Sequence, residues 1–193
     1  DEWSGVNFAD GQEGLYNAEK AKTEFAKAKE ALQGEGVQFP VHLDLPVDQS
    51  SKLNVAQAQS LKQTIEKSLG SENVVIDINQ MSSDDMNNVT SNAANAAAED
   101  WDISNGVGWG PDYQDPSTYL DILKTTSSEN TKIFNGYDDP NNAAAAQVGL
   151  KDYDALLDSA ASETTDLNAR YDRYAQAQAW LEDSSLVIPL TVS

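Results

Sequence analysis

Hydrophobic and polar positions in the first half of the chain follow two different periods. Apolar side chains recur at spacings of three and four between residues 16 and 32, with Lys and Glu on the other faces, which predicts an amphipathic helix. Residues 41–47 alternate apolar and polar side chains, the pattern of a half-buried strand. The same two patterns return over residues 58–69, a helix that ends at Gly70, and over residues 74–78, a second strand.

Further along the chain the periodicity weakens, but the alternation of elements continues. Ser83 or Asp84 is suited to cap a helix that runs through Ala97, and residues 101–103 predict a third strand. Residues 129–146 hold Asn, Asp and four consecutive alanines without a long apolar period, which indicates a surface excursion. Strands that alternate with helices predict an α/β fold, with a mixed and at least partly parallel sheet flanked by helices. Such sheets bind ligands at the carboxyl ends of their strands, so the loop after the third strand is a candidate ligand loop.

The last part of the chain predicts two helices and a terminal strand. Apolar side chains at helical spacing predict helices over residues 153–160 and 171–181. Thr165 or Asp166 is expected to cap the second helix. Residues 186–192 then predict a strand that ends the chain.

Length and composition are those of a single α/β domain that spans residues 1–193. The chain is 39% apolar and 23% charged, enough for one well-buried core. Twelve basic against 32 acidic residues give a net charge of -20, which argues against nucleic acids and anionic membranes as partners. This charge favours cationic ligands, although an acidic surface also serves solubility alone. No apolar run is long enough to span a bilayer or to act as a signal peptide.

The inventory of reactive side chains is small. The chain has no cysteine, which excludes disulfides, thiol nucleophiles and cysteine-based zinc sites. His42 is the only histidine and occupies a polar position of a predicted strand, where we expect it to face solvent. The acidic pairs Asp84-Asp85 and Asp138-Asp139 lack the spacing of a calcium loop, and no phosphate-binding glycine motif occurs. We therefore expect no catalytic residue, no metal site and no cofactor.

The segment GVGWGPDYQDPSTYLDIL combines glycines, which give the backbone conformational freedom, with an aromatic ring and carboxylates. Gly106, Gly108 and Gly110 leave room for another backbone to approach closely. Trp109 offers a wide apolar surface, and Asp112 places a negative charge next to it. This combination is suited to an extended ligand that carries a cationic group.

Other residues of this segment allow more than one interpretation. Asp115 and Pro116 together form a helix start, so we expect Asp115 to act only as a helix cap. Tyr113 either lines the ligand site or covers the end of the sheet. Asp112 and Asp115 are also the obvious carboxylate pair for glycoside hydrolysis, although a carboxylate fixed as a helix cap makes a poor second acid.

Three stretches of the chain resemble one protein family. One is GWGPDYQDPSTYLDIL, which closely resembles the ligand loop of the extracellular solute-binding proteins that deliver oligopeptides and dipeptides to ABC importers, especially the Gram-positive lipoproteins. The second is YNAEKAKTEFAKAKEAL, from Tyr16 to Leu32, which resembles the first helix of the family's second lobe. The third is RYDRYAQAQAWLEDSSLVIPL, from Arg170 to Leu190, which resembles the family's late helix and the strand after it. The resemblance covers nearly the whole chain.

This resemblance implies one lobe of a two-lobed protein with a type II periplasmic-binding-protein-like fold. It implies that the first lobe, a signal peptide and a lipid-anchoring cysteine lie outside this sequence, so that the full-length protein is held at the extracellular face of the cell membrane. The implied partners are oligopeptides, the cognate ABC permease and the first lobe, with the chain itself monomeric. The resemblance further implies that the protein binds a ligand and is not an enzyme. It also implies that the two lobes close around the peptide by a hinge motion.

The resemblance also implies roles for residues of the loop. Gly108, Trp109 and Gly110 match the strip whose main chain pairs with the peptide backbone, and Asp112 matches the carboxylate that receives the α-ammonium group of the peptide. The Gly110-Pro111 pair departs from the family pattern, which leaves the pairing there open. Two other functions stay open: a carbohydrate-active enzyme that uses Asp112 with a second carboxylate, and the same fold binding a non-peptide solute.

Overall fold

The computed structural model describes residues 17–105, 110–127 and 143–188. Contacts divide the chain into two compact units, and each has a core of its own. The sheet unit comprises Asn7–Asn92 and Ala98–Val107, and the helical unit comprises Asp1–Val6, Ala93–Ala97 and Gly108–Ser193. The single domain over residues 1–193 stays a prediction, because two cores do not decide whether a chain unfolds as one cooperative unit.

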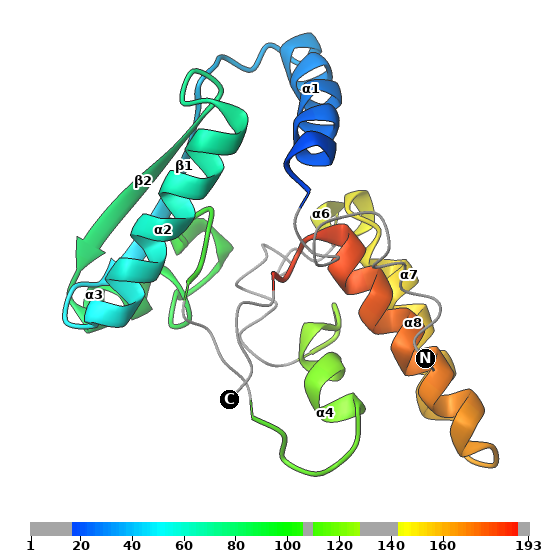
Figure 1. The fold of residues 1–193 in the computed structure, drawn as a ribbon. Coiled ribbons are helices and arrows are strands. Elements are labelled where there is room, and N and C mark those ends of the chain that lie inside the picture. Colours follow the sequence, from blue (N-terminus) through cyan, green and yellow to red (C-terminus); the bar gives the residue numbers. More distant parts are fainter. Residues whose placement is uncertain (1–16, 106–109, 128–142, 189–193) are drawn as a thin grey trace. The chain divides into compact units, whose positions relative to one another are not determined.

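A strand, a helix and a second strand form the centre of the sheet unit (Figure 1). Strand β1 (Val41–Asp48) pairs in parallel with strand β2 (Val74–Met81). Helix α2 (Lys52–Leu69) makes the crossover between them. It begins after Ser51, whose hydroxyl accepts a first-turn N–H, and ends at Gly70, which has a φ of 89° that suits glycine.

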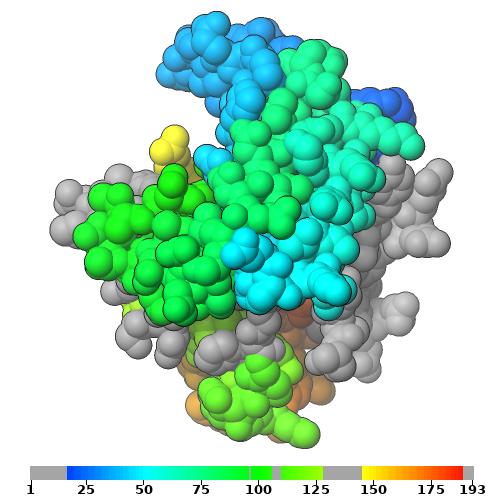
Figure 2. Space-filling model, turned by 90° about the vertical axis from the view of Figure 1, so that its left-hand side faces the viewer, coloured from blue at the N-terminus to red at the C-terminus, as the bar shows by residue number. Residues whose placement is uncertain are grey.

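Apolar side chains from both strands and from α2 make the core of the sheet unit. Helix α1 (Ala18–Gly34) precedes the sheet, and its Phe25 packs partly buried against this core. The buried members of the core are Leu45, Val47, Ala58, Val74 and Ile76. In Figure 2 the described atoms of the sheet unit that follow α1 form one continuous surface, coloured from cyan to green. These elements confirm the two helices and two strands that the hydrophobic pattern predicts.

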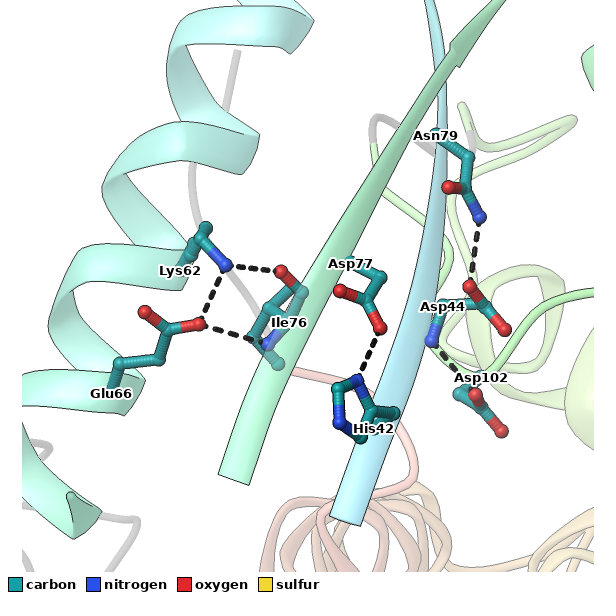
Figure 3. A network of polar contacts seen from close by, with 8 residues as sticks. All are labelled: His42, Asp44, Lys62, Glu66, Ile76, Asp77, Asn79 and Asp102. Atoms are coloured by element: carbon teal, nitrogen blue, oxygen red, sulfur yellow. Dashed lines mark hydrogen bonds and ion pairs between the residues drawn. The ribbon is translucent and has the colours of Figure 1, made fainter. Parts of the chain in front are cut away.

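Side chains from α2 cover the edge of β2 that does not face β1 (Figure 3). Lys62 Nζ donates to the carbonyl oxygen of Ile76 at 2.5 Å, and the Glu66 carboxylate accepts the N–H of Ile76 at 3.0 Å. Lys62 and Glu66 also pair with each other at 2.6 Å. This ion pair therefore satisfies two backbone groups that a neighbouring strand would otherwise bind.

The segment predicted as a third strand lies along the other edge of β1 but is not a strand. The N–H groups of Asp102 and Ile103 both donate to the carbonyl oxygen of Asp44. The Asp102 carboxylate accepts the N–H of Asp44 at 2.8 Å, in place of the backbone carbonyl of a neighbouring strand (Figure 3). Asn105 is held by a side-chain bond to the carbonyl oxygen of Asn54 at 3.1 Å. The strand prediction is wrong because the side chain of Asp102, and not a backbone carbonyl, takes the N–H of Asp44 that a strand ladder would use.

The third predicted helix is shorter than expected. Helix α3 (Ser83–Val89) is capped by Ser82, one position before the expected caps, and is followed only later by the 3₁₀ helix η2 (Ala96–Ala98). It ends at Thr90, whose hydroxyl donates to the carbonyl oxygen of Met86. Polar side chains in this Asn-rich stretch bind nearby backbone groups and so end the helix early.

Two long helices, α7 (Leu150–Ser162) and α8 (Leu167–Ser184), form a hairpin in the helical unit (Figure 1). Both confirm the predicted helices, and Asp166 caps α8 as expected by accepting two backbone N–H groups. The rings of Tyr153 and Trp180 meet across the hairpin with centroids 5.5 Å apart. The buried core of this unit comprises Leu120, Ala145, Leu150, Tyr153, Leu157, Ala160, Tyr174, Ala177 and Leu181.

Part of the predicted surface excursion is helical. Residues 128–142 lie outside the described part of the chain, but the four alanines belong to helix α6 (Ala143–Gln147). Ala145 is fully buried in the core of the helical unit, because its methyl side chain fits against the neighbouring helices. The prediction of an irregular surface excursion is therefore wrong for Ala145, whereas Ala146 is helical but exposed.

Two short predicted elements remain. The helix expected after Asp115 is α4 (Ser117–Leu120), which continues as the 3₁₀ helix η3 (Asp121–Leu123). The predicted terminal strand is not formed over residues 186–188, and residues 189–193 lie outside the described part. No described helix is both long and apolar enough to cross a membrane.

Candidate functional site

The five predicted ligand residues fall partly outside the described chain. Gly108 and Trp109 lie in the undescribed stretch, so their main-chain role stays a prediction. Gly110, Asp112 and Tyr113 are described, and all three are exposed. No atom of the described residues lies within 4 Å of the place that a Cβ atom on Gly110 would take, so another chain has room to approach there.

Asp112 combines an anchored backbone with an exposed carboxylate. Its N–H donates to the hydroxyl of Thr118 at 3.1 Å, and Thr118 is itself buried in α4. Within the described ranges, the Asp112 carboxylate makes no hydrogen bond and no ion pair. Beside it, the Tyr113 hydroxyl lies 3.2 Å from the hydroxyl of Ser117. This arrangement anchors the backbone of Asp112 and leaves its carboxylate accessible to a cation.

Asp115 does more than cap a helix. Its carboxylate accepts the N–H of Ser117 at 3.0 Å, as predicted, but also two bonds from the Arg170 guanidinium on α8, at 2.5 Å and 3.0 Å. Arg170 also lies over the ring of Tyr174, 4.8 Å from its centroid. The hydrogen bonds from Arg170, with those from Ser117, hold the pKa of the Asp115 carboxyl well below its usual range. The prediction that Asp115 acts only as a cap is therefore wrong.

Further contacts fasten the segment after this ion pair to α7. The buried Tyr153 hydroxyl donates to the carbonyl oxygen of Leu120 at 2.8 Å. The Asp154 carboxylate accepts the N–H of Thr125 at 3.0 Å and also its hydroxyl. Since both partners of each contact lie in the helical unit, α4 and η3 are held on a helical support.

A groove of about 750 Å³ lies between residues 111–120 and helix α8. Tyr113, Tyr119 and Tyr171 line it together with Asp172. The hydrophobic pattern assigns Tyr119 and Tyr171 to the apolar faces of helices, yet both side chains are exposed. The pattern misses this groove because it counts a tyrosine at helical spacing as apolar, whether or not another element covers the ring.

The residues considered for catalysis have other contacts. The hydrogen bonds from Arg170 lower the pKa of the Asp115 carboxyl, which disfavours Asp115 as the acid that a glycosidase needs beside Asp112. His42 faces solvent as predicted, with Nδ1 2.7 Å from the Asp77 carboxylate on the adjacent strand (Figure 3). Among the described residues, no group of three or more His, Asp or Glu side chains is placed to hold a metal ion.

Known proteins align with the chain from end to end. It is 66% identical over 193 residues to the oligopeptide-binding protein AmiA of Streptococcus pneumoniae serotype 4, an alignment that covers 100% of this chain and 29% of AmiA. The chain is similar to one segment of an oligopeptide-binding protein. It is also 65% identical over 191 residues to the oligopeptide-binding protein SarA of Streptococcus gordonii, covering 99% of this chain and again 29% of the relative. No protein-family model matches the chain.

Solved structures agree with this similarity at the level of the fold. The peptide-binding protein of a peptide ABC transporter aligns with a TM-score of 0.62 and 22% identity, over 88% of this chain and 63% of that structure. The pheromone receptor PrgZ aligns with a TM-score of 0.59 and 22% identity, over 92% of this chain and 28% of PrgZ. The parallel strands, their flanking helices and these neighbours confirm the predicted α/β class and the periplasmic-binding-protein fold. The sequence relatives confirm the predicted family resemblance, and both are named as oligopeptide-binding proteins.

Proposed function

We propose that this chain is the second-lobe segment of an extracellular oligopeptide-binding protein that serves an ABC importer. The observation that carries the proposal is the end-to-end alignment, at 66% identity, with a protein named for oligopeptide binding. In this proposal the two compact units are parts of a single lobe, and a first lobe supplies the other wall of the cleft. The full-length protein is lipid-anchored at the cell surface, hands peptides to its cognate permease and does no chemistry of its own.

The glycine-rich loop binds the main chain and the amino terminus of the peptide. The main chain of Gly108, Trp109 and Gly110 pairs with the peptide backbone. Because this pairing does not depend on side chains, the site accepts many peptide sequences. Asp112 receives the α-ammonium group. Its exposed carboxylate and the bond from its N–H to Thr118 support this role, because a backbone that is already held in place needs less ordering when the ligand arrives.

The substitution Asp112→Asn in the full-length protein tests this assignment. A charge-assisted hydrogen bond that becomes desolvated on closure contributes about 1.5–3 kcal/mol, so peptide affinity should fall at least about tenfold. The matched control is Asp183→Asn, which removes an exposed aspartate of α8 that is not among the described lining residues of the groove. Asp115→Asn is unsuitable as a control, because it leaves the Arg170 guanidinium without its carboxylate.

Calorimetry with free and N-acetylated forms of the same peptide completes the test. Acetylation should weaken binding to the unmodified protein and have little further effect on the Asp112→Asn variant. Equal affinity of the two forms would show that this carboxylate is not the receptor for the amino terminus. If no peptide binds in either form, oligopeptide capture is refuted, and a sugar or metal complex that binds in its place would identify the non-peptide alternative.

A further inference from the structure

The groove of the helical unit has the size and the support of a ligand site. Its volume of about 750 Å³ falls within the roughly 300–1,000 Å³ that is typical of ligand pockets. One wall is formed by residues 111–120 and the other by α8, so both belong to the same unit. The ion pair between Asp115 and Arg170 joins these two walls through two hydrogen bonds. The groove therefore has a defined width.

Three tyrosine rings in this groove are available to a ligand. The exposed fractions are 59% for Tyr113, 48% for Tyr119 and 46% for Tyr171. Tyr174 also lines the groove, but it is buried and its ring already carries the Arg170 guanidinium. In that contact a cation already lies over a tyrosine ring of the groove wall. The three exposed rings offer the same interaction to a cation from outside.

The groove also carries negative charge that no described residue neutralises. Among the residues that the structure describes, its lining includes Asp115, Asp172 and Glu182 but no Lys, Arg or His. Arg170 neutralises Asp115, whereas Asp172 and Glu182 have no ion-pair partner in the described part of the chain. The one side-chain bond to Glu182 comes from the neutral amide of Gln178, at 3.0 Å. Aromatic walls with two uncompensated carboxylates suit a side chain that has an apolar stem and a positive end.

We propose that this groove is a subsite for a lysine or arginine side chain of the bound oligopeptide. The inference rests on the proposed function and deepens it, because it names the class of peptide that is preferred. Pro111 and Tyr113 line the groove and flank Asp112 in the chain, so a peptide held by Asp112 has the groove within reach of its nearby residues. The aliphatic stem lies along the tyrosine rings, and the charged end meets Asp172. Glu182 lies ten residues further along α8, so it adds to the negative potential of the groove without touching the same charged end.

Alanine hexapeptides that carry a single lysine test the inference on the full-length protein. The lysine is moved through each position in turn, and a matched series carries norleucine, which has a similar apolar stem without the charge. Calorimetry should reveal a position at which lysine binds at least about fivefold more tightly than norleucine. The inference is overturned if both series bind but no position prefers lysine by more than about twofold.

Two substitutions on α8 separate the groove from the overall charge of the chain. Asp172→Asn should lower the lysine preference at least about threefold and leave binding of the norleucine series unchanged. Asp183→Asn removes the same charge from an exposed position outside the groove and should leave the preference intact. Equal losses in both variants would overturn the inference, because the net acidic field would account for both. If neither series binds the unmodified protein, oligopeptide binding is refuted and the subsite with it.

Discussion

The ion pair between Asp115 and Arg170 should contribute strongly to the stability of the helical unit. Asp115→Asn keeps the size of the side chain and an oxygen for the N–H of Ser117. It removes the charge that accepts two guanidinium bonds, at 2.5 Å and 3.0 Å. The guanidinium is then left with no other carboxylate partner among the described residues.

The burial of this pair sets the expected cost. Exposed ion pairs contribute about 0–1 kcal/mol, whereas removing one partner of a buried pair costs about 3–5 kcal/mol. The side chains of Arg170 and Asp115 are 18% and 20% exposed, which places the pair between these cases and nearer the buried one. We therefore expect Asp115→Asn to lower the free energy of unfolding by about 2–3 kcal/mol, which for a chain of this length lowers Tm by roughly 5–10 °C.

A double-mutant cycle with Arg170→Met measures this interaction directly. Thermal unfolding followed by circular dichroism gives the stabilities of both single variants and of the double variant. Each single substitution leaves one charged side chain without its partner, whereas the double substitution removes both charges. The free energy of unfolding of the double variant should therefore fall by much less than the sum of the two single losses. Losses that add to within about 0.5 kcal/mol would refute the reasoning, because independent sites behave in that way.

The pH dependence of the same variant has a defined sign. Because Arg170 lowers the pKa of Asp115 in the folded state, the ion pair stabilises the fold above the unfolded-state pKa of about 3.9. That stabilisation is lost as the pH falls below this value. The destabilisation by Asp115→Asn should therefore be complete at neutral pH and shrink below about pH 4. A loss of the same size at every pH would contradict the assignment.

Two further predictions concern the sheet unit. Burial raises the pKa of Glu99 to about 7, so its ionisation disfavours the folded state as the pH rises from about 4.5 to 7. Glu99→Gln should raise the urea midpoint at about pH 8 and change it little at about pH 4, and equal shifts at both values would contradict this. Lys62→Met removes the donor to the Ile76 carbonyl and opens the edge of β2 to strand pairing, so sedimentation velocity should detect concentration-dependent association. A variant that stays monomeric at every concentration tested would show that this edge is protected in another way.

The sequence by itself determined the elements whose signals are local. The helical period predicts α2 and α8, and Gly70 and Asp166 mark the end of the first and the start of the second. The alternating strands β1 and β2 follow from a period of two over a few residues. The run GWGPDYQDP was enough to indicate the family, because its residues are adjacent in the chain.

Tertiary structure alone decided the features that depend on residues far apart in the chain. Asp115 has the sequence of a simple helix cap, but its partner Arg170 lies 55 residues away. The segment around Asp102 has the composition of a strand, yet its carboxylate takes the N–H of Asp44, 58 residues away, that a ladder would use. Ala145 sits in a polar stretch and is nevertheless fully buried. The physical reason is the same in each case: a local pattern tells which positions tolerate burial or pairing, whereas the partners that fill those positions come from distant segments through packing.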